Sequence, residues 1–368
     1  MKTLYRIHLD SASAMHAVGD ESVDLIVTSP PYPMIAMWDE EFAAADPAVT
    51  AALNAGDGMA AFARMHRQLD VVWAECVRTV RPGGFVCINI GDATRTLAGV
   101  FRLYSNHARV TSACAALGLH SLPAVIWRKP TNAPTKFLGS GMLPAGAYVT
   151  LEHEYILIFR KGPKRAWSGR DAERRRASAF FWEERNAWFS DLWEFTGVRQ
   201  TLETGMGCTR SAAFPFELAW RLIHMFSVQG DTVLDPFLGT GTTAAACLAA
   251  GRNCIGYERH THLYTTIVTT LKRAAKNANR LLADRVEVHH KFIRSRVSRQ
   301  GQSPAYTNHA HGFPVMTQQE VALQFLQLMR VRQTAVGEFA AEYIPAQLAS
   351  CRTMTPTFAL CGDQRQND

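Results

Sequence analysis

The sequence predicts an α/β fold in which helices cover both faces of a parallel sheet. Strand-like and helix-like segments alternate along the chain, an order that is typical of parallel sheets. Pro and Gly loops separate the short apolar runs, and hydrophobic residues make up 47% of the chain against 19% charged residues. At 368 residues, the chain is long enough for two domains or for one large domain with an insertion.

The first part of the chain predicts strands that are joined by helices and loops. The apolar run at residues 23–28 ends at Ser29-Pro30-Pro31-Tyr32, and Arg81-Pro82-Gly83-Gly84 separates a helical pattern from the next apolar run. The expected segments are strands at 23–28, 85–90, 122–127 and 151–159, helices at 59–80 and 105–118, and a loop from Lys129 to Gly146.

The second part resumes this alternation after a segment of different character. Basic side chains cluster at the start of residues 160–200, and aromatic side chains follow them. Beyond residue 297 the pattern weakens, because Gly, Ser, Pro, Asn and His dominate to residue 314. The expected segments are strands at 232–235 and 252–258, and helices at 214–228, 243–250, 261–282 and 317–332.

Charge and cysteine usage narrow the class of protein. A net charge of +7 permits a polyanionic partner without requiring one. The eight cysteines form no CxxC pair, which favours buried reduced thiols over disulfides or a zinc site. Alternation around Glu152-His153-Glu154 favours a half-exposed strand, and we expect no metal. No apolar run approaches the ~18 residues of a membrane span, so we expect a cytoplasmic protein without membrane contact.

A strand, a glycine turn and a helix follow one another around Asp235-Pro236-Phe237-Leu238-Gly239-Thr240-Gly241-Thr242-Thr243. The glycines let the backbone approach a ligand, and the start of the helix offers free N–H groups. Glu258 ends the next strand, where a carboxylate meets a ribose diol in nucleotide-binding folds. Asp235 before the loop and Glu258 after the next strand suit a cofactor that carries an amine and a ribose. An ordinary tight turn stays open as an alternative, since Ala244 replaces the third glycine of the dinucleotide fingerprint.

The loop Ser29-Pro30-Pro31-Tyr32 is rigid and rich in acceptors. Its two prolines fix φ and remove two backbone donors, while their carbonyls remain. Ser29 adds a side-chain acceptor, and Tyr32 adds a flat aromatic face. This combination suits an exocyclic amine on a planar base. A proline-rich turn without a ligand is the alternative.

Together, the two loops resemble the paired motifs of the DNA amino-methyltransferases. Ser29-Pro30-Pro31-Tyr32 is similar to their catalytic motif, and the Asp235–Thr243 loop is similar to their S-adenosylmethionine (AdoMet) motif. The catalytic motif comes first, which resembles the circularly permuted order of the beta class. The resemblance covers roughly residues 4–282 and includes Trp127-Arg128-Lys129 and Glu152-His153-Glu154-Tyr155. It implies a Rossmann-like AdoMet-dependent methyltransferase sheet with an inserted target-recognition region.

The resemblance also implies a reaction. A serine at the first motif position is typical of the branch that methylates the N4 amine of cytosine in duplex DNA, with adenine-N6 methylation as the alternative. The base would be flipped out of the duplex, Tyr32 would stack on it, and Ser29 and the Pro30 carbonyl would accept from the amine. Serine is a poor base, so we expect the proton to leave toward solvent after methyl transfer. The expected catalytic residues are Ser29, Pro30, Pro31 and Tyr32.

The cofactor residues follow from the same resemblance. The two glycines of the AdoMet motif would line the methionine end, Glu258 would meet the ribose and Asp235 would face the amine. Asp10 would meet the adenine edge, unless it lies in a surface turn. The expected cofactor-binding set is Asp10, Thr28, Phe214, Pro215, Asp235, Pro236, Phe237, Gly239, Gly241, Thr242 and Glu258.

DNA recognition is expected between the two motifs. Residues 160–176 hold eight Lys/Arg against two Asp/Glu, and most of the aromatic residues that follow favour a local core. A second basic run, at 285–299, favours a solvated face. The expected DNA contacts are Lys164, Arg165, Arg170, Arg174, Arg175 and Arg176.

These expectations divide the chain into four parts. They are a catalytic half (1–159), a target-recognition region (160–205), an AdoMet-binding half (206–296) and a C-terminal extension of unassigned role (297–368). The expected partners are duplex DNA, a cognate restriction endonuclease and a second copy in a homodimer, in the nucleoid of a prokaryote. A nucleotide-dependent oxidoreductase and a non-catalytic DNA-binding module are the alternatives from other classes. The missing third glycine counts against the first, and the intact pair of loops counts against the second.

Overall fold

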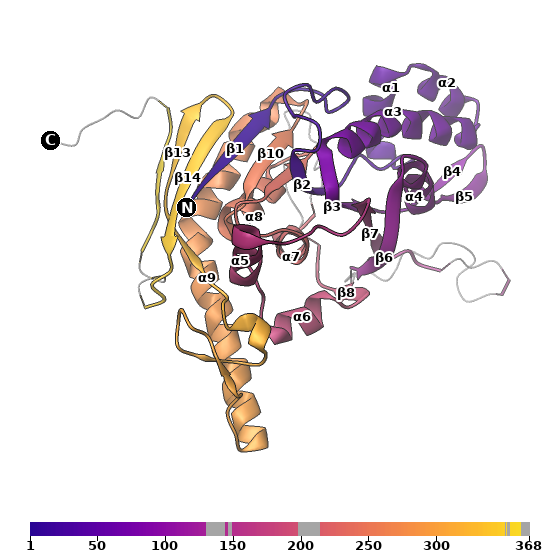
Figure 1. The fold of residues 1–368 in the computed structure, drawn as a ribbon. Helices are drawn as coiled ribbons and strands as arrows, with labels where there is room; N and C mark the ends of the chain where they lie inside the picture. The colour runs from indigo at the N-terminus through magenta and orange to yellow at the C-terminus, as the bar shows by residue number, and fades with distance from the viewer. Residues whose placement is uncertain (130–143, 146–148, 198–213, 350, 352–353, 362–368) are drawn as a thin grey trace.

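The computed structural model describes residues 1–368 except 130–143, 146–148, 198–213, 350, 352–353 and 362–368. The strands of its main sheet are β1 (Lys2–His8), β2 (Val23–Thr28), β3 (Val80–Ile90), β6 (Leu119–Arg128), β7 (His153–Lys161), β8 (Leu192–Glu194), β9 (Thr232–Asp235), β10 (Asn253–Tyr257), β13 (Leu326–Ala335), β14 (Glu338–Pro345) and β15 (Thr357–Ala359). Their order across the sheet is β15-β13-β14-β1-β10-β9-β2-β3-β7-β6-β8 (Figure 1).

The middle of the sheet is parallel, as the sequence predicts. β1, β10, β9, β2 and β3 run in one direction, whereas β7 and β14 are antiparallel to their inner neighbours. The carboxyl ends of the parallel strands therefore meet at one edge, which we call the catalytic edge. The opposite edge, where β2, β3 and β9 begin, is called the amino edge.

Helices cover both faces of the sheet and form two separate cores. One core joins Leu25 and Val27 to the second group of helices, and the other joins Ile26 and Ile88 to the first group. The first group is α1 (Asp39–Ala45), α2 (Ala48–Asn54), α3 (Gly58–Thr79) and α4 (Asn106–Ala116), and the second is α7 (Phe216–Phe226), α8 (Thr242–Ala250) and α9 (Tyr264–Gln300). The predicted three-layer α/β architecture is thus confirmed.

Smaller elements complete the described chain. α3 begins where the Asp57 side chain accepts a hydrogen bond from the backbone N–H of Ala60 at 2.9 Å, which is an N-cap. The remaining elements are the hairpin β4 (Ala93–Leu97) and β5 (Val100–Tyr104), the pair β11 (Tyr306–Thr307) and β12 (Pro314–Val315), the helices α5 (Gly169–Ala177) and α6 (Trp182–Trp188), and the 3₁₀ turns η1 (Ala36–Trp38), η2 (Thr261–Leu263) and η3 (Gln318–Glu320).

The C-terminal part of the chain differs from its prediction. The helix expected at 317–332 is wrong, because residues from Leu326 onward form β13 and pair with β14. A short apolar run is compatible with a helix or a strand. Here the turn at Val336-Gly337 allows β13 to pair with β14, so the run forms a strand. Gly337 has φ +77°, and an added Cβ would lie 2.5 Å from the carbonyl oxygen of Ile7. β14 pairs with β1, so the extension is part of the main sheet.

α9 continues eighteen residues beyond its predicted end at 282 and projects past the sheet (Figure 1). Its far half is stabilised by a third core that includes Val286, Phe181, Phe313 and Phe325. Among the aromatic residues of the 160–200 segment, Phe181, Trp188 and Trp193 are buried, whereas Trp182 and Phe189 are exposed. The buried residues belong to two of the larger cores rather than to one local core. β8 from this segment also pairs with β6, so the segment is tied into the sheet.

Six of the seven cysteines in the described part of the chain are buried free thiols, and Cys361 is exposed. Cys208 lies outside the described residues. Over the described residues, none of the helices has the length and apolar character needed to cross a membrane.

Candidate active site

The two predicted loops meet at the point where the order of the strands reverses. β2 and β9 are neighbours in the sheet; the chain moves from β2 to β3 on one side and from β9 to β10 on the other. In open α/β sheets, ligands bind outside the carboxyl ends of the strands at such a switch point. The fold therefore brings Ser29–Tyr32 and Asp235–Thr243 together, although about 200 residues separate them.

Asp235 holds the two loops to each other. Its carboxylate accepts hydrogen bonds from Thr28 Oγ1 at 2.6 Å, Thr243 Oγ1 at 2.5 Å and the backbone N–H of Phe237 at 3.0 Å. The side chain is buried, and burial raises the pKa of Asp235 to about 6. Asp235 does not line the cavity described below, and its expected contact with a cofactor amine, directly or through water, stays a prediction.

The glycine loop adopts the conformation that its sequence predicts. Gly239 and Gly241 have φ values of 55° and 88°, which residues with a Cβ rarely adopt, and Gly241 is the N-cap of α8. Glu258, just after β10, accepts from the backbone N–H groups of Gly239 and His260 at 2.9 and 2.8 Å. Burial raises the pKa of Glu258. The two hydrogen bonds fix the position of the carboxylate beside the loop.

A cavity of about 380 Å³ opens between the loops and the first group of helices. This volume lies in the range of small-molecule sites. The predicted residues that line it are Asp10, Ser29, Pro31, Phe214, Pro236, Phe237, Gly239, Thr242 and Glu258. The predicted residues Thr28, Pro30, Tyr32, Pro215, Asp235 and Gly241 do not line it. Sequence reasoning missed the lining residues Trp38, Phe42, Leu69, Val72 and Leu263, whose apolar spacing is that of ordinary core.

Tyr32 lies at the centre of a polar network beside this cavity. Its hydroxyl lies 3.0 Å from Ser29 Oγ, accepts from Asn89 Nδ2 at 2.8 Å and donates to Glu154 Oε2 at 2.9 Å. Lys129 Nζ forms an ion pair with the other oxygen of Glu154. Burial, and then the charge of Glu154, hold the pKa of Tyr32 well above its usual value.

The expected catalytic set lacks three members of this network, Asn89, Lys129 and Glu154. They reach the catalytic edge from the end of β3, the end of β6 and the start of β7. Gly91 lets Tyr32 and Glu154 pack close to the backbone. A Cβ added at this position would lie only 3.0 Å from Tyr32 Cε2 and 3.2 Å from Glu154 Cγ. The sequence did contain a signal for these residues: Asn89, Gly91, Lys129 and Glu154 lie at or near the ends of predicted strands.

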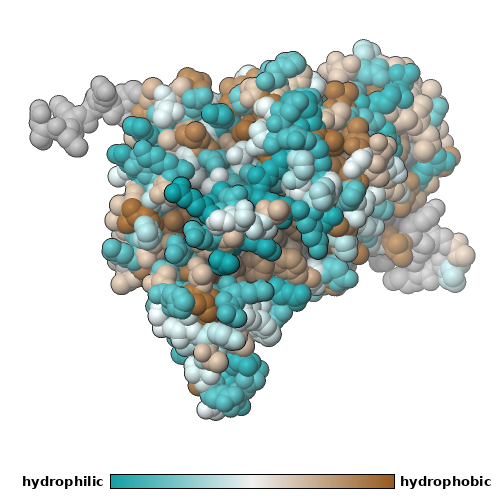
Figure 2. Space-filling model, viewed as in Figure 1, coloured by the Kyte–Doolittle hydropathy of each residue, from teal (hydrophilic) through white to brown (hydrophobic). Residues whose placement is uncertain are grey.

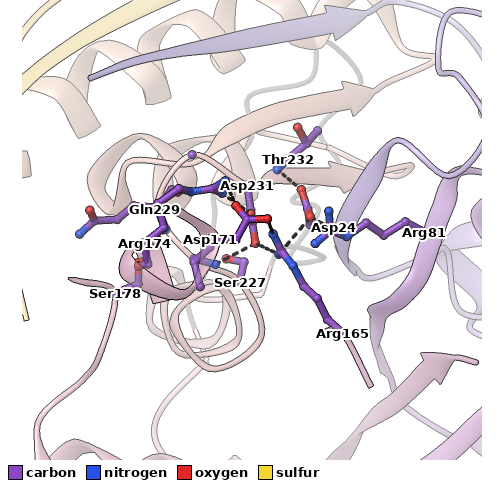
Figure 3. Close-up of polar contacts among 12 residues, drawn as sticks. Asp24, Arg81, Arg165, Asp171, Arg174, Ser178, Ser227, Gln229, Asp231 and Thr232 are labelled. Carbon is purple, nitrogen blue, oxygen red and sulfur yellow. Dashed lines mark hydrogen bonds and ion pairs between the residues drawn. The ribbon is translucent and has the colours of Figure 1, made fainter. Parts of the chain in front are cut away.

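The basic segment contacts the edge of the sheet opposite to the two loops. Arg165 contacts Asp231 at 2.9 Å and Asp24 at 3.3 Å, and Arg174 contacts Asp231 at 2.7 Å (Figure 3). Asp24 is the second residue of β2 and Asp231 precedes β9, so the network lies at the amino edge. Burial raises the pKa of Asp24, and the neighbouring Asp231 raises it further.

Two of the six expected DNA contacts, Arg165 and Arg174, take part in this network, and DNA binding by the six residues stays a prediction. Arg165 and Arg174 neutralise buried carboxylates and hold α5 to the amino edge, away from Ser29. The other predicted contacts, Lys164, Arg170, Arg175 and Arg176, are exposed on or near α5. Figure 2 shows hydrophilic side chains gathered over this face. None of the six residues lines the cavity at the catalytic edge.

Over the described residues, no group of three or more His, Cys, Asp and Glu side chains is arranged to hold a metal ion. His153 and Glu154 belong to β7, as the alternation of the sequence predicts.

Comparisons with known proteins match a part of the chain that includes both loops. The model of the DNA methylase family N6_N4_Mtase matches residues 23–269. The Type II methyltransferase M.MthZI of Methanothermobacter thermautotrophicus is 45% identical over 346 residues, which cover 93% of this chain and 96% of the relative. The Type II methyltransferase M.MjaI of Methanocaldococcus jannaschii is 48% identical over 270 residues, which cover 70% of this chain and 87% of the relative.

A solved structure agrees with these sequence matches. The structure of TTHA0409 from Thermus thermophilus, in complex with S-adenosyl-L-methionine, is 30% identical with a TM-score of 0.57. The match covers 73% of this chain and 94% of that protein. The residues matched by the family model include both Ser29 and Glu258.

Proposed function

Since the chain belongs to the N6_N4_Mtase family of DNA methylases, we propose that it methylates the exocyclic N4 amine of cytosine in duplex DNA. The family depends on AdoMet. One observation carries the proposal: a single cavity is lined by Ser29 and Pro31 from one loop and by Gly239 and Thr242 from the other. A methyl donor and an amine bound at these two loops would lie side by side.

The residues around the cavity suit the parts of AdoMet. Glu258 is fixed by two backbone N–H groups and would accept from the ribose hydroxyls. Asp10 lies in the cavity wall, as the adenine-edge role requires, and Phe214 covers the same space. Bound AdoMet supplies an electrophilic methyl group. The chain itself then has to hold donor and acceptor in line, which is a positioning task.

The proline loop would orient the amine. Pro30 and Pro31 have no N–H, so their rigid backbone presents acceptors only. Ser29 Oγ and the Pro30 carbonyl would accept from the two N–H groups of the amine and direct its lone pair toward the methyl group. The target base would reach them by flipping out of the duplex and stacking on Tyr32.

The preference for cytosine rests on Ser29, because the adenine-N6 branch usually carries Asp at this position. Both bases present a conjugated amine to the same acceptors, so adenine N6 is the second candidate. We propose duplex DNA as the substrate, and a cognate restriction endonuclease and a homodimer as further partners.

The proposal is tested by incubating the purified protein with tritiated AdoMet and duplex DNA of mixed sequence. Nucleosides from the product are then separated and identified by mass. We expect label in N4-methylcytosine. Label in N6-methyladenine would replace the proposed base, and no transfer to DNA would overturn the function.

Glu258 offers a test of the cofactor site. We expect Glu258→Gln to raise the Kd for AdoMet by about tenfold or more, roughly 1.4 kcal/mol of binding free energy. The new amide group would face the backbone N–H of Gly239 or His260 with a donor in place of an acceptor. Calorimetric titration measures the Kd.

The matched control is Glu342→Gln on β14, whose carboxylate pairs with Arg330 away from the cavity. Its Kd for AdoMet should equal that of the wild type. An unchanged Kd in Glu258→Gln would remove Glu258 from the cofactor site.

A further inference from the structure

We propose that Glu154 is a positioning residue that acts through Tyr32: it makes Ser29 a hydrogen-bond acceptor for the substrate amine and takes up the proton that the amine loses. The inference rests on the proposed function, because it assigns a role within the same site. It concerns residues on β3, β6 and β7 that the two loop motifs do not contain.

The geometry forms a continuous chain from the cavity to a carboxylate. Ser29 lines the cavity, and its Oγ lies 3.0 Å from the hydroxyl of Tyr32. That hydroxyl lies 2.9 Å from Glu154 Oε2. Asn89 Nδ2 donates to both ends of the second contact, to the Tyr32 hydroxyl at 2.8 Å and to Glu154 Oε2 at 2.7 Å.

Counting protons gives a direction to this chain. The Tyr32 hydroxyl has one proton and two neighbours that can accept it, Ser29 and Glu154. A carboxylate is the stronger acceptor, so the proton goes to Glu154. The Ser29 hydroxyl must then donate its own proton to Tyr32. Ser29 Oγ then faces the cavity with lone pairs only, so it can accept a hydrogen bond from an amine N–H.

Lys129 and Asn89 hold the carboxylate of Glu154 in place beside Tyr32. Lys129 pairs with Oε1, so that Oε2 is left for Tyr32 and Asn89. The side chain of Glu154 is 12% exposed, so its carboxylate is shielded from most solvent, whereas the side chain of Lys129 is 36% exposed. Tyr32 remains protonated at neutral pH, because burial and the charge of Glu154 raise its pKa well above the usual value.

The same chain has a place for the proton that the reaction releases. Once the N–CH₃ bond has formed and the S–CH₃ bond of the donor has broken, the donor is a neutral thioether and the amine nitrogen carries one excess positive charge. It gives an N–H proton to Ser29 Oγ, the hydroxyl proton of Ser29 passes to Tyr32, and that of Tyr32 passes to Glu154. The product is then a neutral methylated base and a neutral Glu154, which later loses its proton to solvent.

The test compares single-turnover rates of Glu154→Gln, Tyr32→Phe and the double variant with excess protein over duplex DNA. Gln keeps the shape of Glu154 but removes its charge and its capacity to take a proton, and Phe keeps the ring of Tyr32. We expect each single variant to lose about 10- to 100-fold in rate, less than the 10²–10⁴ of a group that exchanges the proton directly. The Kd values for AdoMet and for DNA should stay within twofold.

The double variant measures whether the two groups act as one chain. We expect it to be no slower than the slower single variant, because either substitution breaks the same path. Glu152→Gln is the matched control: it changes a carboxylate two residues away that is directed toward Arg128, and its rate should equal the wild-type rate.

Several results would overturn the inference. Wild-type rates in Glu154→Gln, or multiplicative losses in the double variant, would contradict it. If Glu154→Gln does not fold, a wild-type rate in Tyr32→Phe would also contradict it, and a loss of 10- to 100-fold would support it. Absence of transfer by the wild-type protein would instead overturn the proposed function, so the two failures are distinguishable.

Discussion

Replacing Ser29 by alanine is expected to slow methyl transfer in a single turnover by about 10²- to 10³-fold. The side chain lines the cavity and is the group that would accept from the amine as positive charge develops on its nitrogen. The Kd for AdoMet should stay within twofold, because Asp235 and Thr28 hold the glycine loop without Ser29. Rapid-quench assays with labelled AdoMet measure the rate, and calorimetry measures the Kd.

The matched control is Ser22→Ala. Ser22 lies directly before β2, at the amino edge, whereas Ser29 directly follows the same strand at the catalytic edge. Its hydroxyl donates to the carbonyl of Gly19 on an exposed turn. Its rate should equal that of the wild type, and equal rates in both variants would remove Ser29 from the reaction.

Replacing Asp231 by alanine is expected to lower the free energy of unfolding by about 3 kcal/mol. Its side chain is 2% exposed and receives ion pairs from Arg165 and Arg174 (Figure 3). It also accepts from the backbone N–H of Val228 at 3.0 Å. Removing it leaves the partly buried Arg165 with Asp24 at 3.3 Å and the more exposed Asp171 at 3.8 Å. It also removes the ion pair of Arg174 that helps to hold α5 to the amino edge. Urea unfolding, followed by circular dichroism, measures the loss.

Asp171→Ala provides the comparison. Asp171 pairs with Arg174 at 2.8 Å in the same network, but its side chain is 48% exposed. We expect a loss below about 1 kcal/mol, as is usual for exposed pairs. Equal losses in the two variants would show that burial of Asp231 does not determine the strength of this network.

The sequence was most informative where function depends on local chain conformation. Prolines after β2 fix the backbone, glycines after β9 permit positive φ, and both loops lie at the catalytic edge. The alternation of segments also predicted the parallel centre of the sheet. Short-range pattern and loop chemistry were sufficient for these features.

Contacts between distant strands could not be predicted in this way. The bracing role of Asp235 depends on β2 lying beside β9, and a motif alone cannot state that neighbour. Glu154 reaches Tyr32 because β7 runs antiparallel to β3, which brings its first residues to the catalytic edge. A polar residue in an alternating strand gives no sign of what it faces.

The basic segment shows the limit of counting charges. Residues 160–176 have a large positive excess, but the carboxylates that pair with Arg165 and Arg174 come mainly from β2 and the turn before β9. Those acidic residues lie far from the segment in sequence. The β13 strand is a similar case, since its partner β14 and the turn at Gly337 decide between strand and helix.

The most direct test of the central claim is expression of the chain in a bacterial host without DNA methylation, followed by modification-aware sequencing of the host genome. A strain that expresses Ser29→Ala is the control. We expect N4-methylcytosine at one position of one short sequence, present with the wild-type chain and absent or strongly reduced with the variant. Methylated adenine at such a sequence, or a genome without new methylation, would contradict it.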